Sequence, residues 1–108
     1  MKPDEIDYDN LTFSFTGTKS MYVSKCKLGE DWKKGQLIPF NDVKISPAAT
    51  ILNYGQGLFE GMKAYRTKSD EIIMFRPEEN AKRAANGCLR LSMPEISESV
   101  FLDGVTNV

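Results

Sequence analysis

The sequence predicts an α+β fold in which short antiparallel strands and a hairpin are followed by two amphipathic helices. Apolar and polar residues alternate in several short segments before residue 77, and the polar turn 67–70 separates two of these segments. Beyond Pro77 the apolar residues recur with the period of a helix. A chain of 108 residues suits one such unit and is too short for two lobes, so we expect a single domain over residues 1–108.

The first half of the chain supplies the first expected strands. Residues 11–16 and 21–26 alternate apolar with polar side chains, and residues 36–40 form a further extended segment. Residues 27–35 are polar and flanked by glycine, which is typical of an exposed connection. We therefore expect two strands, a loop and a third strand.

A brief helix is expected next, followed by a hairpin. Ser46 and Pro47 have the order of a helix N-cap and a first helical residue, and the glycines of residues 53–57 should end that helix. Residues 62–66 and 71–76 flank a polar turn, so they are predicted to pair as a hairpin.

Two helices complete the predicted fold. Pro77 and the acidic residues after it are typical of a helix start, and the helix should end near Ser92. Gly87 inside it is expected to cost about 1 kcal/mol relative to alanine. Ser97 is the expected N-cap of the second helix. The apolar stripes of the two helices are Ala81, Ala84, Ala85 and Cys88, then Phe101, Val105 and Val108.

Composition excludes several classes of function. The chain contains no histidine, which removes Ser-His and Cys-His nucleophile pairs and histidine-ligated metal sites. Its 14 basic and 15 acidic residues are spread evenly, so nucleic-acid binding has no basic footprint. Cys26 and Cys88 stand far apart and are expected to be buried free thiols.

The sequence also bears on location. The longest run drawn from Ile, Val, Leu, Met and Phe is 72–75, far too short to cross a bilayer. The acidic N-terminus has the character of neither a signal peptide nor a transit peptide. We expect a cytoplasmic protein with no membrane partner, or a plastid or mitochondrial one if a leader is missing.

Two segments could carry chemistry. Residues 52–61 hold three glycines and two aromatics, which suit either a structural turn or a close approach to a ligand. On the helix face opposite the alanines, Arg83 could hold a phosphate or carboxylate with two parallel hydrogen bonds. The alternative is a solvated helix face with a weak Glu79–Arg83 pair. Composition alone favours the structural interpretation of both segments.

These segments together resemble the branched-chain aminotransferases, which are pyridoxal-phosphate enzymes of fold type IV. The matching residues are 51–66 (ILNYGQGLFEGMKAYR), 75–83 (FRPEENAKR) and 90–94 (RLSMP), with a weaker match over 21–47. Ordered motifs over about half of the chain identify the family far better than a lone glycine-rich loop would. The resemblance implies an amino transfer between leucine, isoleucine or valine and 2-oxoglutarate.

The resemblance further implies roles for named residues. Arg83 matches the arginine that grips the phosphate of pyridoxal 5'-phosphate. Tyr54, Phe59 and Gly61 match residues that contact the substrate, and the family forms part of this pocket across a homodimer interface. The chain corresponds to the N-terminal small domain of the family.

The same resemblance implies that the catalytic lysine is absent. In the family the Schiff-base lysine lies in a larger C-terminal domain, and Lys63 matches a strand position that does not carry the cofactor. We therefore expect no catalytic residue within residues 1–108, and an isolated chain that is inactive. Two interpretations stay open: a fragment of the enzyme, or a catalytically inactive truncated paralogue that acts as a dimerisation partner.

Overall fold

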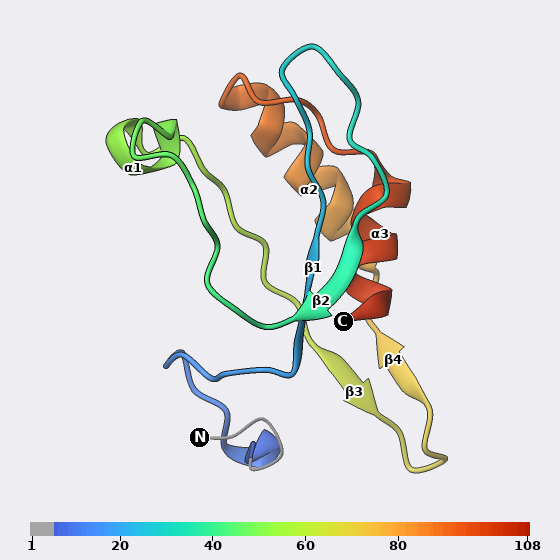
Figure 1. Cartoon of the computed structure of the whole chain (residues 1–108). Helices are drawn as coiled ribbons and strands as arrows, with labels where there is room; N and C mark the ends of the chain where they lie inside the picture. Colours follow the sequence, from blue (N-terminus) through green and yellow to red (C-terminus); the bar gives the residue numbers. More distant parts are fainter. Residues whose placement is uncertain (1–5) are drawn as a thin grey trace.

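The computed structural model describes residues 6–108, which form two small antiparallel sheets and three α-helices (Figure 1). In the first sheet β1 (Ser20–Val23) pairs with β2 (Gln36–Pro39), with Ser20 opposite Pro39. In the second, β3 (Ala64–Arg66) pairs with β4 (Ile72–Met74), with Ala64 opposite Met74. These pairings and the helices confirm the α+β prediction.

Helices α2 (Pro77–Arg90) and α3 (Glu98–Asn107) pack against each other, and α3 also contacts β1. Both follow the predicted boundaries. Pro77 is the first residue of α2, and the Ser97 hydroxyl accepts a hydrogen bond of 3.3 Å from the Val100 N–H. In the part of the chain that the structure describes, the buried apolar residues are Ala81, Ala84 and Cys88. All three belong to the predicted stripe, and its fourth member, Ala85, is half-buried.

The short helix α1 (Thr50–Tyr54) projects away from α2 and α3 (Figure 1). It begins later than predicted, because Ser46 caps a preceding turn in which its hydroxyl accepts from the Ala48 N–H at 3.1 Å. Gly55 ends the helix with a φ of 64°, a left-handed conformation that glycine adopts without steric strain.

The predicted strand over residues 11–16 is wrong. These residues contain no regular element, and the only helical turn before β1 is the 3-10 helix η2 (Tyr8–Asn10) in the described range. The Ser14 N–H instead bonds to the Thr12 hydroxyl, and Phe13 and Phe15 are exposed. A strand needs a partner for its backbone, and alternation alone does not supply one.

Two side chains connect the β1–β2 sheet and its loop to the helices. The Tyr22 hydroxyl donates to the Asp103 carboxylate of α3 and accepts a 2.7 Å bond from the Gly35 N–H. The Trp32 indole N–H donates to the Pro94 carbonyl at 2.8 Å. The loop over residues 27–35 is exposed as predicted except at Trp32 and Gly35, which are half-buried.

The two cysteines are free thiols. Cys88 is buried as expected, whereas Cys26 is only half-buried in the loop after β1. No helix within residues 6–108 has the length and apolar character needed to cross a membrane.

Candidate functional site

Arg83 forms a two-pronged ion pair with Glu60, which lies 23 residues earlier in the glycine-rich segment. Its Nε donates to one carboxylate oxygen of Glu60 at 2.6 Å, and its Nη2 donates to the other at 2.7 Å. Parallel bonds of this kind fix the relative orientation of the two planar groups. The pair therefore joins α2 to the chain that leads into β3.

Glu60 is the less exposed partner of this pair. Its side chain is 10% exposed and that of Arg83 is 71% exposed. The hydrogen bonds from Arg83 are the main cause that lowers the pKa of the Glu60 carboxyl, with a further contribution from Asn80 and an opposing one from burial. Glu60 is therefore charged at neutral pH.

Asn80 anchors Glu60 from the same helix. Its side-chain amide donates to Glu60 Oε2 at 3.0 Å and to the Gly61 carbonyl at 3.1 Å. Asn80 and Arg83 are three residues apart on α2, so they face the same side of the helix. Neither Glu60 nor Asn80 was predicted as a site residue, although both lie inside the family motifs.

Glu79 and Arg83, the pair that belonged to the alternative of a solvated helix face, have other partners. Glu79 Oε1 instead lies 2.9 Å from the Lys82 Nζ and 3.6 Å from Arg76 Nη2. Glu60 reaches Arg83 because the glycine-rich segment lies along α2. A spacing of four residues is compatible with a pair and does not exclude a better partner from another element.

A hollow of about 370 Å³ brings together three of the four predicted site residues, Phe59, Gly61 and Arg83, with Leu58, Glu60 and Gly87. This contact accounts for a glycine at position 87, because a Cβ there would lie 3.0 Å from the Leu58 side chain. The glycine inside α2 lets the helix approach the glycine-rich segment closely. Phe59 is 92% exposed at the edge of this hollow.

Tyr54 does not line this hollow. It is the last residue of α1 and its side chain is 86% exposed. Two residues later the Gln56 side chain donates to the Leu91 carbonyl at 2.6 Å, which ties the end of α1 to the end of α2. The glycine-rich segment is thus held at both ends, by Gln56 and by Asn80.

A second, more apolar hollow of about 490 Å³ lies between β1, α3 and the β3–β4 hairpin. Its lining includes Tyr22, Met62, Met74, Phe101 and Val105. None of the predicted site residues belongs to it, and its walls carry no charged side chain. It is a gap in the packing of the apolar residues.

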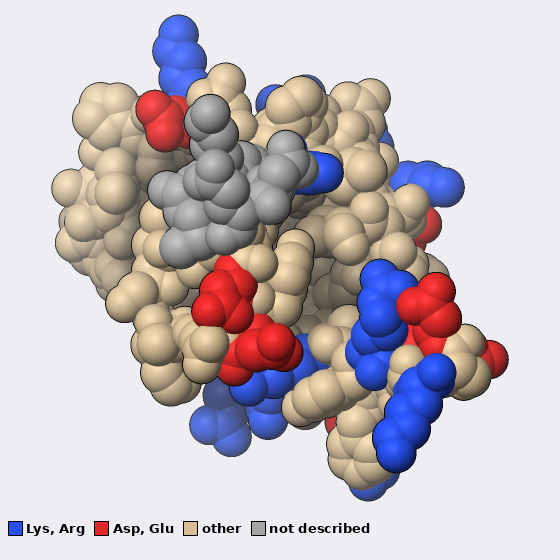
Figure 2. Space-filling model, turned by 90° about the horizontal axis from the view of Figure 1, so that it is seen from below, with Lys and Arg blue, Asp and Glu red and all other residues tan. Residues whose placement is uncertain are grey.

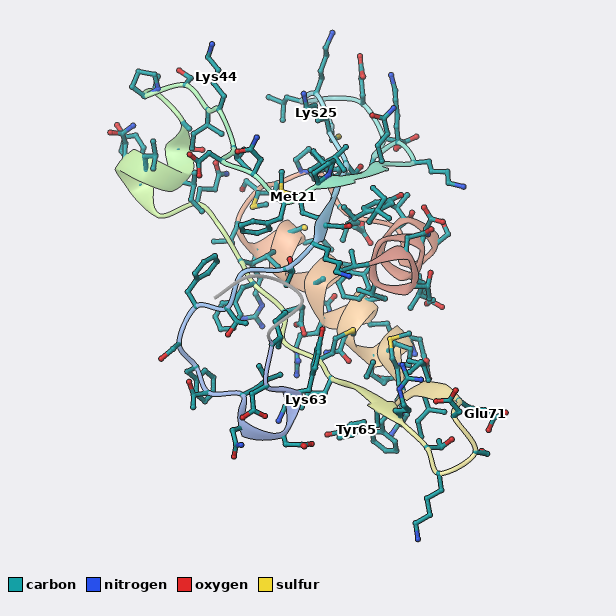
Figure 3. The ribbon with its side chains drawn as sticks, turned by 60° about the horizontal axis from the view of Figure 1, so that its bottom comes forward. Met21, Lys25, Lys44, Lys63, Tyr65 and Glu71 are labelled. Atoms are coloured by element: carbon teal, nitrogen blue, oxygen red, sulfur yellow. The ribbon has the colours of Figure 1, made fainter. Side chains whose placement is uncertain are left out.

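Lys63 lies on the segment that leads into β3, close to Tyr65 (Figure 3). The labelled Lys25 and Lys44 lie toward the other end of the molecule. Lys63 is exposed and does not line the hollow beside Arg83. On the face shown in Figure 2, basic and acidic side chains are interspersed over a broad uncharged surface.

The described residues fit a phosphate group in part. A guanidinium has five N–H donors, and Glu60 accepts from two of them, so three are not bonded to any residue in the range 6–108. The Glu60 charge offsets that of Arg83, so this corner offers oriented donors with little net charge. Residues 6–108 hold no cluster of three metal-ligating side chains.

No protein-family model matches the chain. It is 50% identical over 101 residues to the chloroplastic branched-chain amino acid aminotransferase 2 of Humulus lupulus, a match that covers 94% of this chain. It is 40% identical over 105 residues, 97% of the chain, to the branched-chain-amino-acid aminotransferase of Helicobacter pylori. The chain is homologous to the branched-chain aminotransferases. This confirms the predicted resemblance.

The homology covers a limited part of these enzymes. The chain spans about a quarter of the Humulus lupulus relative (25%) and 31% of the Helicobacter pylori relative. A further relative, 43% identical over 95% of the chain, is a methionine aminotransferase of Arabidopsis thaliana, of which the chain spans 29%. These relatives are all named aminotransferases, while their names differ in substrate.

Proposed function

We propose that residues 1–108 form the small N-terminal domain of a branched-chain aminotransferase that uses pyridoxal 5'-phosphate. The observation that carries this proposal is the 50% identity over 94% of the chain to the enzyme of Humulus lupulus. The lysine that binds the cofactor would belong to a larger domain outside these residues. Transfer would run between leucine, isoleucine or valine and 2-oxoglutarate.

Arg83 is proposed to bind the phosphate of the cofactor. When bound, pyridoxal 5'-phosphate supplies an electron sink for the carbon that loses its proton. Arg83 would contribute donors for the phosphate, since three of its N–H groups are left over from the pair with Glu60. Because the local net charge is small, the remaining donors for a dianion would come from the rest of the enzyme.

Phe59, Gly61 and Tyr54 are proposed to contact the substrate. Phe59 and Gly61 support this by lining the same hollow as Arg83. An aliphatic side chain has no polar group to recognise, so its selection requires an enclosed apolar wall. The exposed rings of Tyr54 and Phe59 would gain that enclosure from a second copy in a homodimer.

The experiment is a chimera in which residues of this chain replace the matching segment of the Humulus lupulus enzyme. In this chimera Arg83→Ala should weaken the binding of pyridoxal 5'-phosphate by roughly ten- to a hundredfold, because a charge-assisted contact contributes about 1.5–3 kcal/mol. Arg83→Lys should restore only part of this affinity, since an ammonium cannot donate two parallel bonds.

Arg90→Ala is the matched control, because Arg90 lies in the last turn of the same helix and does not line the hollow. It should leave the affinity for pyridoxal 5'-phosphate unchanged. Equal affinities for Arg83→Ala and Arg90→Ala would contradict the proposed role of Arg83. The 108-residue chain alone should neither transaminate nor develop a stoichiometric visible absorbance band with the cofactor, and a band removed by Lys63→Ala would contradict this.

A further inference from the structure

The orientation of the Arg83 guanidinium is set by hydrogen bonds and not by packing. Its side chain is 71% exposed, so neighbouring atoms restrict its rotamers little. Within residues 6–108, the acceptors of its hydrogen bonds are the two oxygens of Glu60. An arginine in solvent would otherwise lose conformational freedom when it bound an anion.

Glu60 is well placed to act as a fixed support. Its side chain is 10% exposed, and the Asn80 amide donates both to its Oε2 and to the carbonyl of the next residue, Gly61. Asn80 and Arg83 therefore hold one carboxylate from one face of α2. The half-buried carboxylate is held by two partners on one helix.

This arrangement determines which edge of the guanidinium remains for a ligand. The Nε and one Nη2 hydrogen are directed to Glu60, so the Nη1 hydrogens and the second Nη2 hydrogen remain for another acceptor. Glu60 and Arg83 line the same hollow of about 370 Å³. A phosphate that reached Arg83 would thus meet a guanidinium with a predetermined orientation.

The Glu60 charge also has an opposing effect, because a carboxylate repels a phosphate. The guanidinium lies between the carboxylate and any acceptor on its outer edge, and the exposure of Arg83 to solvent screens the repulsion. Loss of orientation, in contrast, would weaken every hydrogen bond that the outer edge donates. We expect the orienting effect to dominate.

We propose that Glu60, held by Asn80, is a positioning residue that orients Arg83 toward the phosphate of the cofactor. This inference rests on the proposed function and adds a residue pair to it. Glu60 need not touch the cofactor, since its effect passes through Arg83.

The test compares pyridoxal 5'-phosphate with pyridoxal, which lacks the phosphate, as ligands of the chimeric enzyme. Glu60→Gln should lower the preference for the phosphorylated ligand by about 3- to 10-fold, as expected when a charge-assisted contact is weakened, and leave the affinity for pyridoxal nearly unchanged. Asn80→Ala, which keeps the Glu60 charge, should lower the same preference by a smaller factor. In an Arg83→Ala background, Glu60→Gln should have no further effect.

Glu79→Gln is the control, because Glu79 is an acidic residue of α2 that pairs with Lys82 and Arg76 instead. A preference that falls with Arg83→Ala and stays constant with both Glu60→Gln and Asn80→Ala would overturn the positioning role while leaving the proposed function standing. A preference that stays constant with Arg83→Ala would overturn the proposed function itself. The positioning role would also be overturned if Glu60→Gln weakened the binding of pyridoxal 5'-phosphate and pyridoxal equally, or if it increased the preference for pyridoxal 5'-phosphate.

Discussion

Two regions of the molecule differ in how their apolar residues are covered: the two long helices with the β1–β2 sheet, and the irregular segments that flank this sheet in the sequence. In the helix layer, which we define as β1, β2, α2 and α3, the small side chains Ala81, Ala84 and Cys88 are buried. In the arms, which we define as residues 11–16 and 43–59, the exposed large side chains include Phe13, Phe15, Val43, Ile51, Leu52, Tyr54 and Phe59. The helix layer thus holds the packed interior, and the arms present apolar surface.

Polar side chains account for part of this difference. Tyr22 reaches Asp103 across 81 residues of sequence, and Trp32 reaches Pro94 across 62. In the arms, the Asn53 side chain bonds to the carbonyls of Pro47 and Ala49, which are close in sequence, whereas Gln56 at the end of α1 reaches the Leu91 carbonyl across 35 residues. Large apolar areas without cover are uncommon on monomers and are typical of interaction surfaces. We therefore expect the arms to act as interaction surfaces.

The largest expected effect comes from placing a charge in the helix layer. Ala84→Asp buries a carboxylate without a partner and should cost about 3–5 kcal/mol of unfolding free energy, enough to unfold a marginal domain. The matched control in the arms is Ala48→Asp, since Ala48 is exposed. Circular dichroism during urea denaturation measures both variants, and equal losses would remove the distinction between the two regions.

The second largest loss of unfolding free energy is expected when the polar contact between β1 and α3 is removed. Tyr22→Phe removes the hydroxyl that donates to Asp103 and leaves the Gly35 N–H without its acceptor. A hydrogen bond to a charged group contributes about 1.5–3 kcal/mol, so the unfolding free energy should fall by that amount. Tyr8→Phe, at an exposed tyrosine in η2, should change it little. A Tyr22→Phe variant as stable as the parent in thermal denaturation would show that packing alone holds α3 on β1.

A smaller effect concerns acid pH at the Glu60–Arg83 pair, where an arm meets the helix layer. The folded-state pKa of Glu60 is lowered, so its contribution is fully present above the unfolded value of about 4.3 and is lost as pH falls through the folded value. This contribution should be up to about 1 kcal/mol, because the Arg83 side of the pair is exposed. Between pH 3 and 7, the unfolding free energy measured by denaturation should therefore depend less on pH for Glu60→Gln than for the parent chain. An equal pH dependence in the two proteins would exclude the pair as a source of acid sensitivity.

The smallest effect on stability is expected in the arms, together with a change in association. Phe13→Ser should alter the unfolding free energy by less than about 0.5 kcal/mol, because Phe13 is fully exposed. The parent chain should self-associate through the arms, and Phe13→Ser and Phe59→Ser should reduce this in sedimentation velocity. Lys68→Ser in the β3–β4 turn is the control and should leave the association unchanged. A parent chain that sediments as a monomer at high concentration would contradict the interpretation of the arms as an interaction surface.

The elements with local signals can be predicted from the amino-acid sequence alone. Pro77, the alanine stripe and the Ser97 cap predict α2 and α3, and the polar turn before β4 predicts the hairpin, because each pattern acts on backbone within a few residues. The ordered motifs over 51–66 and 75–83 also identified the family. Phe101 and Val105 are half-buried against neighbouring elements, whereas the end of their stripe, Val108, is exposed.

Only the tertiary structure decided how side chains on separate elements meet. The alternation over residues 11–16 predicts a strand, yet within residues 6–108 no partner strand pairs with it. The spacing of Glu79 and Arg83 allows a pair, yet Glu60 binds Arg83. The bond between Tyr22 and Asp103 had no sequence signal either. Local patterns specify backbone conformation within a few residues, whereas these contacts join residues 20 to 81 positions apart and depend on how whole elements pack.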